Sequence, residues 1–422
     1  MNVYIYGLGH VGLPMAVWMA LSGQKVIGID SKREHLEKIK KGAVEIHEYY
    51  KGIHIAKLAQ NMIESGKLCV LDKLERTVFE PAIFIVSVGF NISKENKLDF
   101  SPLQNVLDNI LPQLTADDLL LFRTTMIPGT CENLIIPKLR NLRFPVSFAY
   151  CPETIAETHA FEELDKNPLI LAAIDEESMK KAEAFWRSLS DAPIYKASNL
   201  RTAEMVKVIQ NIDRDVNIAL INEISEVAEK LAIDVTELRA LVNTHPRVNL
   251  LQPGPGVGGY CIPHALRYLE AALPDKDLDL NIMRTARENN NQRPYHVVKL
   301  IQKALRDADK LLQNATIALF GLAMKDDCAD YRFSPAITIT EKLLNLGAKV
   351  KAFDPLVPPV YHFQVGSFSE SIQLADCFVI TAIHKGFRFD IGELRANMNQ
   401  PLVVVDTRNV FPYHDDVRLY KM

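Results

Sequence analysis

The chain has 422 residues, of which 48% are hydrophobic and 24% are charged, and its formal net charge is −4. This length predicts two or three domains of an ordinary globular protein. The slightly negative charge argues against nucleic-acid binding, and no apolar run reaches membrane-spanning length. The six cysteines lack paired metal-site spacing, and no signal peptide is evident. We therefore expect no metal, free thiols and a cytoplasmic location.

The first thirty residues carry the pattern of a dinucleotide-binding fold. A short strand at residues 2–6 leads into G-x-G-x-x-G, formed by Gly7, Gly9 and Gly12, and a helix and a second strand ending at Asp30 follow. The glycines permit the tight turn, the close approach of a pyrophosphate and close packing of helix against strand. The helix N-terminus then faces the phosphates. Asp30 is expected to accept hydrogen bonds from ribose hydroxyls, which favours NAD over NADP.

Further residues of this region are expected beside the cofactor. Arg33 follows the acid closely, so NADP is disfavoured rather than excluded. The apolar run 82–88 predicts a central parallel strand, and ligands of such sheets lie at the carboxyl ends of the strands. We therefore expect Val88 and Gly89 near the cofactor, together with Val11 of the glycine motif.

Two later strands end in candidate site residues. Thr125 follows a strand at 119–122, so it either points into the crevice beyond the sheet or caps a helix. A strand at 146–150 leads into Glu153 and Glu157. These two acids, four residues apart, either share a site or lie on a solvated helix face.

Residues 200–231 form the longest helical pattern, with apolar residues at close to helical spacing. Such a helix is long enough to bridge two domains, and its apolar face could bury a partner subunit. Lys207 and Asn211 lie one turn apart on it. The lysine either extends to solvent, which the spacing slightly favours, or serves as a site ammonium.

A stretch at 252–263 surrounds one cysteine, Cys261, with four glycines and three prolines. Glycine lets the backbone approach a ligand and proline stiffens the flanks, so we predict a rigid, exposed loop that presents the thiol. A thiol can attack an aldehyde, and the adduct can lose a hydride to become a thioester. The alternative is a structural turn with a buried cysteine.

The rest of the chain predicts a second α/β unit without the full glycine fingerprint. Helices are expected at 278–291 and 295–304, with a flexible connection at 275–279 or 307–313. Strands and a helix alternate again after that. We predict an α/β fold of two Rossmann-like domains joined by a long central helix and a helical middle segment. The expected domains are 1–198, 199–300 and 301–422.

Taken together, these motifs resemble the nucleotide-sugar 6-dehydrogenases, the UDP-glucose/GDP-mannose dehydrogenase family. The resemblance covers nearly the whole chain and rests on GLGHVGLP, TTMIPGT, CPETIAE, AEMVKVIQN, HPRVNLLQPGPGVGGYCIP and GLAMKDDCADYRFSP. It is greatest to the branch that oxidises UDP-N-acetylmannosamine or UDP-N-acetylglucosamine. The resemblance implies oxidation of the sugar C6 alcohol to a uronate by two NAD without a metal, in a homodimer that makes polysaccharide precursors.

The resemblance also implies roles for the candidate residues. Cys261 would be the nucleophile, with Lys207 stabilising the oxyanion and Asn211 assisting by hydrogen bonding. Glu157, beside Glu153, would activate water for thioester hydrolysis, and Thr125 would orient that water and touch the cofactor. The implied substrate contacts are Glu153, Glu157, Lys207, Asn211, Gly256, Gly258, Lys325, Arg332 and Arg247, the last reaching the sugar site of a neighbouring subunit.

The chain departs from the family at three places. The family usually has an aspartate four residues after the cysteine, acting with the lysine as acid and base, where this chain has Ala265 preceded by His264. Residues 88–91 and 48–50 also differ from the family pattern. The loss of the aspartate could slow alcohol oxidation, transfer the role to His264 or change the activity; His264 could instead be merely exposed. The alternatives are therefore UDP-glucose oxidation, a degenerate member with little turnover, or a two-electron hydroxyacid dehydrogenase that tolerates loss of Cys261.

Overall fold

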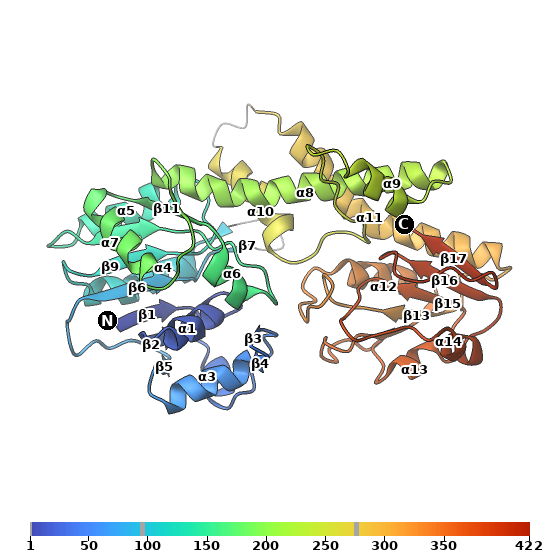
Figure 1. The fold of residues 1–422 in the computed structure, drawn as a ribbon, viewed down its shortest axis with the longest axis horizontal. Helices are drawn as coiled ribbons and strands as arrows, with labels where there is room; N and C mark the ends of the chain where they lie inside the picture. Colours follow the sequence, from blue (N-terminus) through green and yellow to red (C-terminus); the bar gives the residue numbers. More distant parts are fainter. Residues whose placement is uncertain (1, 93–97, 274–277) are drawn as a thin grey trace. The chain divides into compact units, whose positions relative to one another are not determined.

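The computed structural model describes residues 2–92, 98–273 and 278–422, drawn in Figure 1. The described residues divide into two compact units. Unit 1 comprises 2–92, 98–210 and 267–273, and unit 2 comprises 211–266 and 278–422. Within these ranges, no helix is both long enough and apolar enough to cross a membrane.

Unit 1 is built on an eight-stranded sheet with the order β12-β11-β10-β9-β6-β1-β2-β5. All neighbouring strands run parallel except β10 and β11. The strands are β1 (Asn2–Tyr6), β2 (Lys25–Ile29), β5 (Leu68–Leu71), β6 (Ala82–Val86), β9 (Leu119–Phe122), β10 (Ser147–Tyr150), β11 (Leu169–Ala173) and β12 (Ile194–Lys196). Two short pairs, β3 (Tyr49–Tyr50) with β4 (Ile53–His54) and β7 (Asn91–Ile92) with β8 (Leu98–Asp99), lie outside this sheet.

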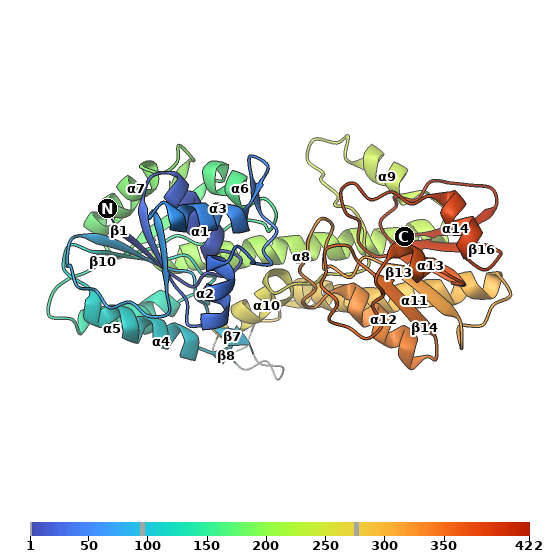
Figure 2. The same ribbon diagram turned by 90° about the horizontal axis from the view of Figure 1, so that it is seen from below.

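Helices cover both faces of the unit 1 sheet, because alternate side chains of a strand point to opposite faces. Along β1, Val3 and Ile5 belong to one core cluster, and Tyr4 and Tyr6 belong to the other. Figure 2 shows the two helical layers on opposite sides of the sheet. The first layer holds α1 (Gly12–Leu21), α2 (Arg33–Lys40), α3 (Ile55–Glu64), α6 (Ala160–Lys166) and α7 (Glu176–Arg187); the second holds α4 (Ser101–Ile110), the π-helix η2 (Cys131–Ile135) and α5 (Ile136–Arg140). A short 3₁₀ turn, η1 (Leu111–Gln113), follows α4.

Unit 2 is built on a five-stranded, wholly parallel sheet with the order β14-β13-β15-β16-β17. Its strands are β13 (Thr316–Phe320), β14 (Lys349–Phe353), β15 (Cys377–Ile380), β16 (Leu402–Asp406) and β17 (Val417–Lys421). Helices α11 (Asn281–Asp307) and α12 (Pro335–Asn345) pack on one face, and α13 (Phe368–Ile372) and α14 (Ile391–Asn397) pack on the other. The prediction of two Rossmann-like halves is therefore confirmed.

Three further helices precede α11 in the chain: α8 (Leu200–Lys230), α9 (Val235–Val242) and α10 (Cys261–Ala272). The long helix predicted at 200–231 is thus confirmed as α8. The expected domain boundary at 198/199 precedes this helix, and the boundary at 300/301 falls inside α11.

Two local predictions were wrong. The two helices expected around Pro294 are one continuous helix, α11, with the proline inside it. Proline removes one helical hydrogen bond and disturbs the carbonyl four residues earlier, but the neighbouring Arg293 and Asn290 are anchored by buried bonds to α8 that hold the helix together. Cys261 begins α10 rather than lying in a loop. Pro263 is compatible with this start because the first N–H groups of a helix have no partner within the helix. Of the expected flexible connection at 275–279, residues 275–277 lie outside the described ranges.

Candidate functional site

The turn after β1 leaves room for a ligand at one of its glycines. Gly7 has φ +88°, in the left-handed region that glycine tolerates. A Cβ at Gly12 would overlap the carbonyl oxygen of Gly7, whereas a Cβ at Gly9 would meet nothing within 4 Å. Gly12 also begins α1. The motif therefore packs tightly at its ends and stays open in the middle, beside a helix N-terminus, as a pyrophosphate requires.

Asp30 is oriented by the same turn. Its two carboxylate oxygens accept hydrogen bonds from the backbone N–H groups of Leu8 and Lys32, each at 2.9 Å. A carboxylate offers about four acceptor positions, so capacity remains for the ribose hydroxyls of a dinucleotide. Arg33, by contrast, is exposed, and its Nε lies 2.8 Å from Asp72 Oδ2. That ion pair competes with the predicted cofactor contact.

The end of β6 faces the glycine turn. Ser87 Oγ donates to the carbonyl oxygens of Tyr6 and Gly7, at 2.9 and 2.8 Å. A Cβ added to Gly7 would lie 2.7 Å from Val88 Cγ2, and one added to Gly89 would lie 2.7 Å from the hydroxyl of Thr124. The structure thus brings residues 88–89 against the turn and against the segment that contains Thr125, which is half-buried.

The two acids after β10 occupy different environments, and the segment 151–156 is not helical. Glu153 is buried and accepts from Arg123 Nε at 2.9 Å. Its other oxygen accepts from the backbone N–H groups of Thr154 and Ile155, at 2.7 and 3.0 Å. Glu153 therefore shapes this segment. Glu157 is half-buried, and its Oε1 lies 3.5 Å from Nδ1 of His10, a residue of the glycine motif.

The first turns of α8 connect to the segment after Thr125. The carboxylate of Glu204 is fully buried and accepts from the backbone N–H groups of Gly129 and Cys131, at 2.5 and 2.8 Å. Sequence analysis missed this anchor, because a lone glutamate in a helix carries no distinguishing signal. Lys207, half-buried, and Asn211, buried, follow on the same helix, one turn apart.

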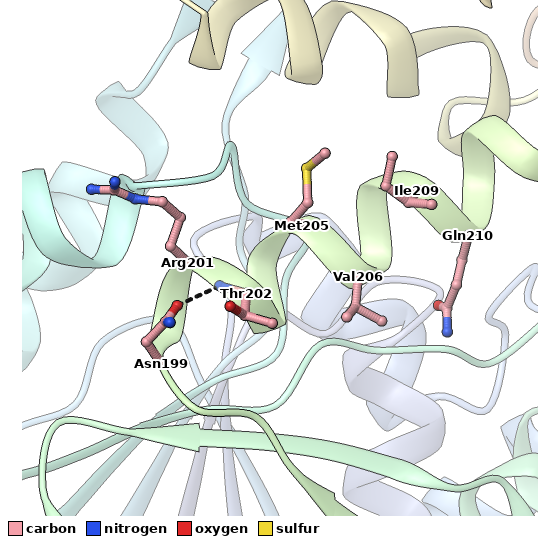
Figure 3. A pocket seen from close by; sticks show the side chains of 7 residues that line it. All are labelled: Asn199, Arg201, Thr202, Met205, Val206, Ile209 and Gln210. Carbon is pink, nitrogen blue, oxygen red and sulfur yellow. Dashed lines mark hydrogen bonds between the residues drawn. The ribbon is translucent and has the colours of Figure 1, made fainter.

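A pocket of about 570 Å³ lies along the same part of α8. Figure 3 shows the side chains that line it: Asn199, Arg201, Thr202, Met205, Val206, Ile209 and Gln210. Asn199 Oδ1 accepts from the backbone N–H of Thr202 at 2.8 Å and begins the helix. None of the predicted site residues lines this pocket, and of its apolar members Ile209 is exposed whereas Met205 and Val206 are half-buried.

In unit 2, Cys261 is exposed at the first position of α10. The N–H groups of a first helical turn have no partner within the helix, and the helix end carries partial positive charge. An anionic oxygen formed next to this thiol would therefore be stabilised electrostatically. The predicted presentation of one exposed thiol is confirmed, although a helix presents it.

The glycines before Cys261 are required by packing. A Cβ at Gly258 would lie 2.7 Å from the carbonyl oxygen of Phe333 and 2.9 Å from Met324 Cβ. Gly256 has φ +141°, and a Cβ there would lie 3.1 Å from Pro335 Cγ. These contacts hold the stretch against the loop that follows β13. They give Gly256 and Gly258 a structural role besides the substrate contacts predicted for them.

His264 is buried rather than exposed. Its ring stacks on Tyr260 and meets Phe333 edge-on, each at a centroid distance of 5.3 Å. Its Nδ1 lies 2.8 Å from the carbonyl oxygen of Tyr260. Because a carbonyl only accepts, this contact assigns the proton to Nδ1 and makes Nε2 the basic nitrogen of the neutral ring. Arg332 lies beside this cluster, with Cζ 5.1 Å from the Tyr260 ring centroid and Nε 2.8 Å from Asp330 Oδ1.

The carboxyl edge of the unit 2 sheet adds one cation that sequence analysis missed. Arg408 follows β16 and donates to Asp326 Oδ2 at 2.6 Å, and its backbone carbonyl accepts from Gln252 at 3.0 Å. A basic residue just after an apolar strand was the available signal. Lys325 is half-buried in the loop after β13, and Arg247 is exposed beyond α9. Among the described residues, no cluster of three or more acids, histidines or cysteines is placed to hold a metal.

Comparison with known proteins finds one family along the chain. Three models of the UDP-glucose/GDP-mannose dehydrogenase family match: its NAD binding domain at 1–190, its central domain at 201–292 and its UDP binding domain at 318–413. The UDP-N-acetyl-D-mannosamine dehydrogenase of Methanocaldococcus jannaschii is 32% identical over 416 residues, 97% of this chain and 92% of the relative. That of Pyrococcus horikoshii is 33% identical over 414 residues, 97% and 96% of the two chains.

Solved structures agree with these matches. A structure of the UDP-D-ManNAc dehydrogenase from Pyrococcus horikoshii superposes with a TM-score of 0.89 at 30% identity, covering 100% of this chain and 99% of that one. The UDP-N-acetyl-mannosamine dehydrogenase Cap5O from Staphylococcus aureus superposes with a TM-score of 0.84, also at 30% identity, covering 100% and 98%.

Proposed function

Because the chain belongs to the UDP-glucose/GDP-mannose dehydrogenase family and is an NAD-dependent UDP-sugar dehydrogenase, we propose that it oxidises UDP-N-acetylmannosamine at C6 to the uronate. The relatives and structures named above act on that sugar, and residues 245–261 resemble the same branch. UDP-N-acetylglucosamine is the next candidate. We further propose a cytoplasmic enzyme that supplies a polysaccharide precursor, since its cysteines are free thiols.

The exposed thiol at the start of α10 is the observation that favours a four-electron reaction. In the first oxidation, the C6 carbon loses a hydride to NAD and its hydroxyl loses a proton to a base, which leaves an aldehyde. The Cys261 thiolate then adds to the aldehyde carbon. The thiohemiacetal loses a second hydride to a second NAD and becomes a thioester. Water cleaves the thioester, which releases the carboxylate and restores the thiol.

The other proposed roles follow the charges that develop in these steps. Lys207 and Asn211 stabilise the oxyanion of the adduct, a role suited to a half-buried ammonium and a buried amide. Glu157 removes a proton from the attacking water, and Thr125 orients that water. Lys325 and Arg332 neutralise the diphosphate of the nucleotide sugar. The open position at Gly9 and the acceptor oxygens of Asp30 hold the dinucleotide.

The base for the first oxidation differs from that of the family, because Ala265 has no proton to exchange. We assign this task to His264. The contact of its Nδ1 with the Tyr260 carbonyl leaves Nε2 as the basic nitrogen, one helical turn from Cys261. His264→Gln should lower the rate of the first NADH without changing the alkylation rate of Cys261. An unchanged first-NADH rate would exclude His264 as this base.

We propose that the protein acts as a homodimer through α8. Leu220 and Val227 are 48% and 55% exposed, and their spacing of seven residues places them on one face of the helix; Leu231, directly after the helix, is 63% exposed. An exposed apolar stripe of this kind fits a second copy of the same stripe. Val227→Glu should convert the dimer to a monomer in light scattering. A wild-type chain that is monomeric at micromolar concentration would contradict the proposal. Arg247 would act in the partner's sugar site.

The substrate proposal is tested by mixing the protein with NAD and each of four UDP-sugars. The panel is UDP-N-acetylmannosamine, UDP-N-acetylglucosamine, UDP-N-acetylgalactosamine and UDP-glucose, and NADH is followed by absorbance. We expect UDP-N-acetylmannosamine to give the highest kcat/KM. A higher value for UDP-glucose would replace the proposal. Binding of a UDP-sugar and NAD without NADH formation would identify a degenerate family member.

A further inference from the structure

A buried polar cluster in unit 2 holds the stretch that leads to Cys261. Both polar backbone groups of Gly254 are bonded by side chains: its N–H donates to Asn222 Oδ1 at 3.0 Å, and its carbonyl oxygen accepts from Arg293 Nε at 3.1 Å. Asn222 comes from α8 and Arg293 from α11. Asn222 and Arg293 are each 2% exposed. Side chains of two helices therefore hold the backbone of Gly254 in place.

The guanidinium of Arg293 has a fixed orientation. Besides Gly254, it donates to the Asn222 carbonyl oxygen at 3.2 Å, to Ser225 Oγ at 2.6 Å and to Glu226 Oε1 at 2.8 Å. Burial lowers the pKa of Arg293 to about 10, although Glu226 opposes the shift. The group is therefore a cation at neutral pH, and its planar fork of donors is used in several directions at once.

The backbone between this grip and the thiol has little freedom. Only residues 255–260 separate Gly254 from Cys261. Gly259 donates its N–H to the Arg332 carbonyl oxygen at 2.9 Å, and Gly258 packs against Met324. A Cβ added at Gly254 would lie 2.9 Å from Arg408 Nη1. A displacement of Gly254 is therefore transmitted to the start of α10 rather than absorbed in a loop.

We propose that Arg293 and Asn222 are positioning residues for the Cys261 thiol. They fix the backbone of Gly254, and through it the place of the thiol at the start of α10, without contacting the reacting atoms themselves. This inference rests on the proposed function in one respect, namely that Cys261 is the nucleophile. The first oxidation does not need the thiol, whereas addition to the aldehyde does. Loss of the grip should therefore affect the second oxidation selectively.

The test compares Arg293→Met and Asn222→Ala with the wild type in the full-length protein. A misplacement of about 1 Å can cost on the order of 10²-fold in rate, so we expect Arg293→Met to lower kcat for uronate formation by at least about 30-fold. KM for the UDP-sugar and the Kd of NAD should stay within about threefold. The NADH formed per sugar should fall from two towards one, with aldehyde trapped by hydroxylamine. Asn222→Ala should act in the same direction and less strongly.

A matched control comes from the same helix pair. Arg287 of α11 also bonds α8, through Asp215 Oδ1 at 2.9 Å, and its Nε donates to Asn291 Oδ1 of α11 at 3.1 Å, so both of these bonds stay within the helix pair. Arg287→Met should keep the NADH count at two. Arg293→Lys retains the charge without the fork, so it should fold where Arg293→Met does not and should show a smaller loss of the second oxidation.

The outcomes separate the two proposals. If the folded Arg293 variants keep kcat within threefold and an unchanged rate of Cys261 alkylation by iodoacetamide, the positioning role is wrong. The same conclusion follows if Arg287→Met lowers the second oxidation as much as Arg293→Met does. If Cys261→Ala itself still forms two NADH per sugar, the proposed function fails first, whatever the Arg293 variants do.

Discussion

The two Rossmann-like halves begin in the same way. Gly7 after β1 and Gly321 after β13 have φ of +88° and +95°. A hydroxyl from the neighbouring strand closes each turn: Ser87 Oγ donates to the Gly7 carbonyl oxygen at 2.8 Å, and Thr381 Oγ1 donates to that of Gly321 at 2.5 Å. In each half an aspartate follows the second strand, Asp30 in unit 1 and Asp354 in unit 2.

The halves differ in how many hydrogen-bond acceptor positions those two aspartates leave unused. Asp30 is half-buried and accepts two backbone N–H groups. Asp354 is 5% exposed, accepts from the backbone N–H groups of residues 322, 323, 356 and 357, and lies 3.1 Å from His384 Nε2. Its acceptor positions are filled. The same turn therefore supports an open acid that suits a ribose in one half and a structural anchor in the other.

Of the changes at these aspartates, we expect the largest loss of unfolding free energy from Asp354→Ala. Asp354→Ala removes the acceptor of four backbone N–H groups, three of them in buried residues, and the partner of His384, so it should cost about 3–5 kcal/mol of unfolding free energy. Asp30→Ala should cost only about 1 kcal/mol, since it removes the acceptor of two backbone N–H groups, one of them exposed, and of no charged partner. Urea unfolding of both variants measures the difference. Equal losses of unfolding free energy would show that Asp30 and Asp354 contribute equally to stability.

The effect on NAD should have the opposite order. Asp30→Ala should raise the Kd of NAD at least about tenfold, equivalent to about 1.4 kcal/mol, because the ribose loses a charged acceptor. Folded Asp354→Ala should bind NAD as the wild type does. Isothermal titration gives both constants. If Asp354→Ala weakened NAD binding as much as Asp30→Ala does, the assignment of the dinucleotide site to unit 1 would be wrong.

The contributions of Asp354 and Glu204 to the stability of their units should change with pH in opposite directions. Burial raises the pKa of Asp354, but hydrogen bonds from His384 and backbone amides outweigh it and hold the pKa below its usual 3.8. Its contribution is therefore complete above about pH 3.8 and is lost as pH falls through the lower folded pKa. In unit 1, burial raises the pKa of Glu204 above its usual 4.5. Unit 1 should therefore lose stability as pH rises from 4.5 through that folded pKa.

Hydrogen exchange between pH 3 and 7, resolved by unit, separates these two dependences. Glu204→Gln should remove the dependence in unit 1 and leave that of unit 2, and Asp354→Asn should do the reverse. A pH dependence in unit 1 that survives Glu204→Gln would assign it to another group.

The smallest effect is expected at Arg33. Its ion pair with Asp72 is exposed on both sides, and such pairs contribute about 0–1 kcal/mol. Arg33→Ala should change the unfolding free energy by less than about 0.5 kcal/mol and the Kd of NAD by less than about threefold, against the predicted cofactor role. A tenfold weaker binding of NAD would restore that role and sharpen the contrast between the halves.

Local signals explain what could be predicted from the sequence. The glycine turn, the strand before it and Asp30 lie within thirty residues, and each has a residue type tied to one conformation. The apolar periodicity of residues 200–231 likewise predicted the long helix α8. Asp354 ends a strand in the same way as Asp30, so nothing local reveals that Asp354 accepts from four backbone N–H groups, two of them about thirty residues earlier, and lies beside His384, thirty residues later.

Contacts between distant segments explain what was missed. Glu204 acts on an amide 75 residues earlier, and Arg293 acts on a carbonyl 39 residues earlier. Other long-range bonds, from Asn290 and Arg293 to α8, carry α11 through Pro294, where the local rule predicted a break. His264 looked exposed because it follows a glycine-rich stretch, and it is buried because Phe333, far along the chain, packs against it.

In the proposed reaction, one chain removes four electrons from one sugar through Cys261. The decisive measurement is the number of NADH formed per UDP-N-acetylmannosamine consumed, in wild type and in Cys261→Ala. We expect two NADH per sugar for the wild type and no uronate from the variant. One NADH per sugar in the wild type, unchanged in Cys261→Ala, would contradict it and identify a two-electron dehydrogenase in which the thiol plays no chemical part.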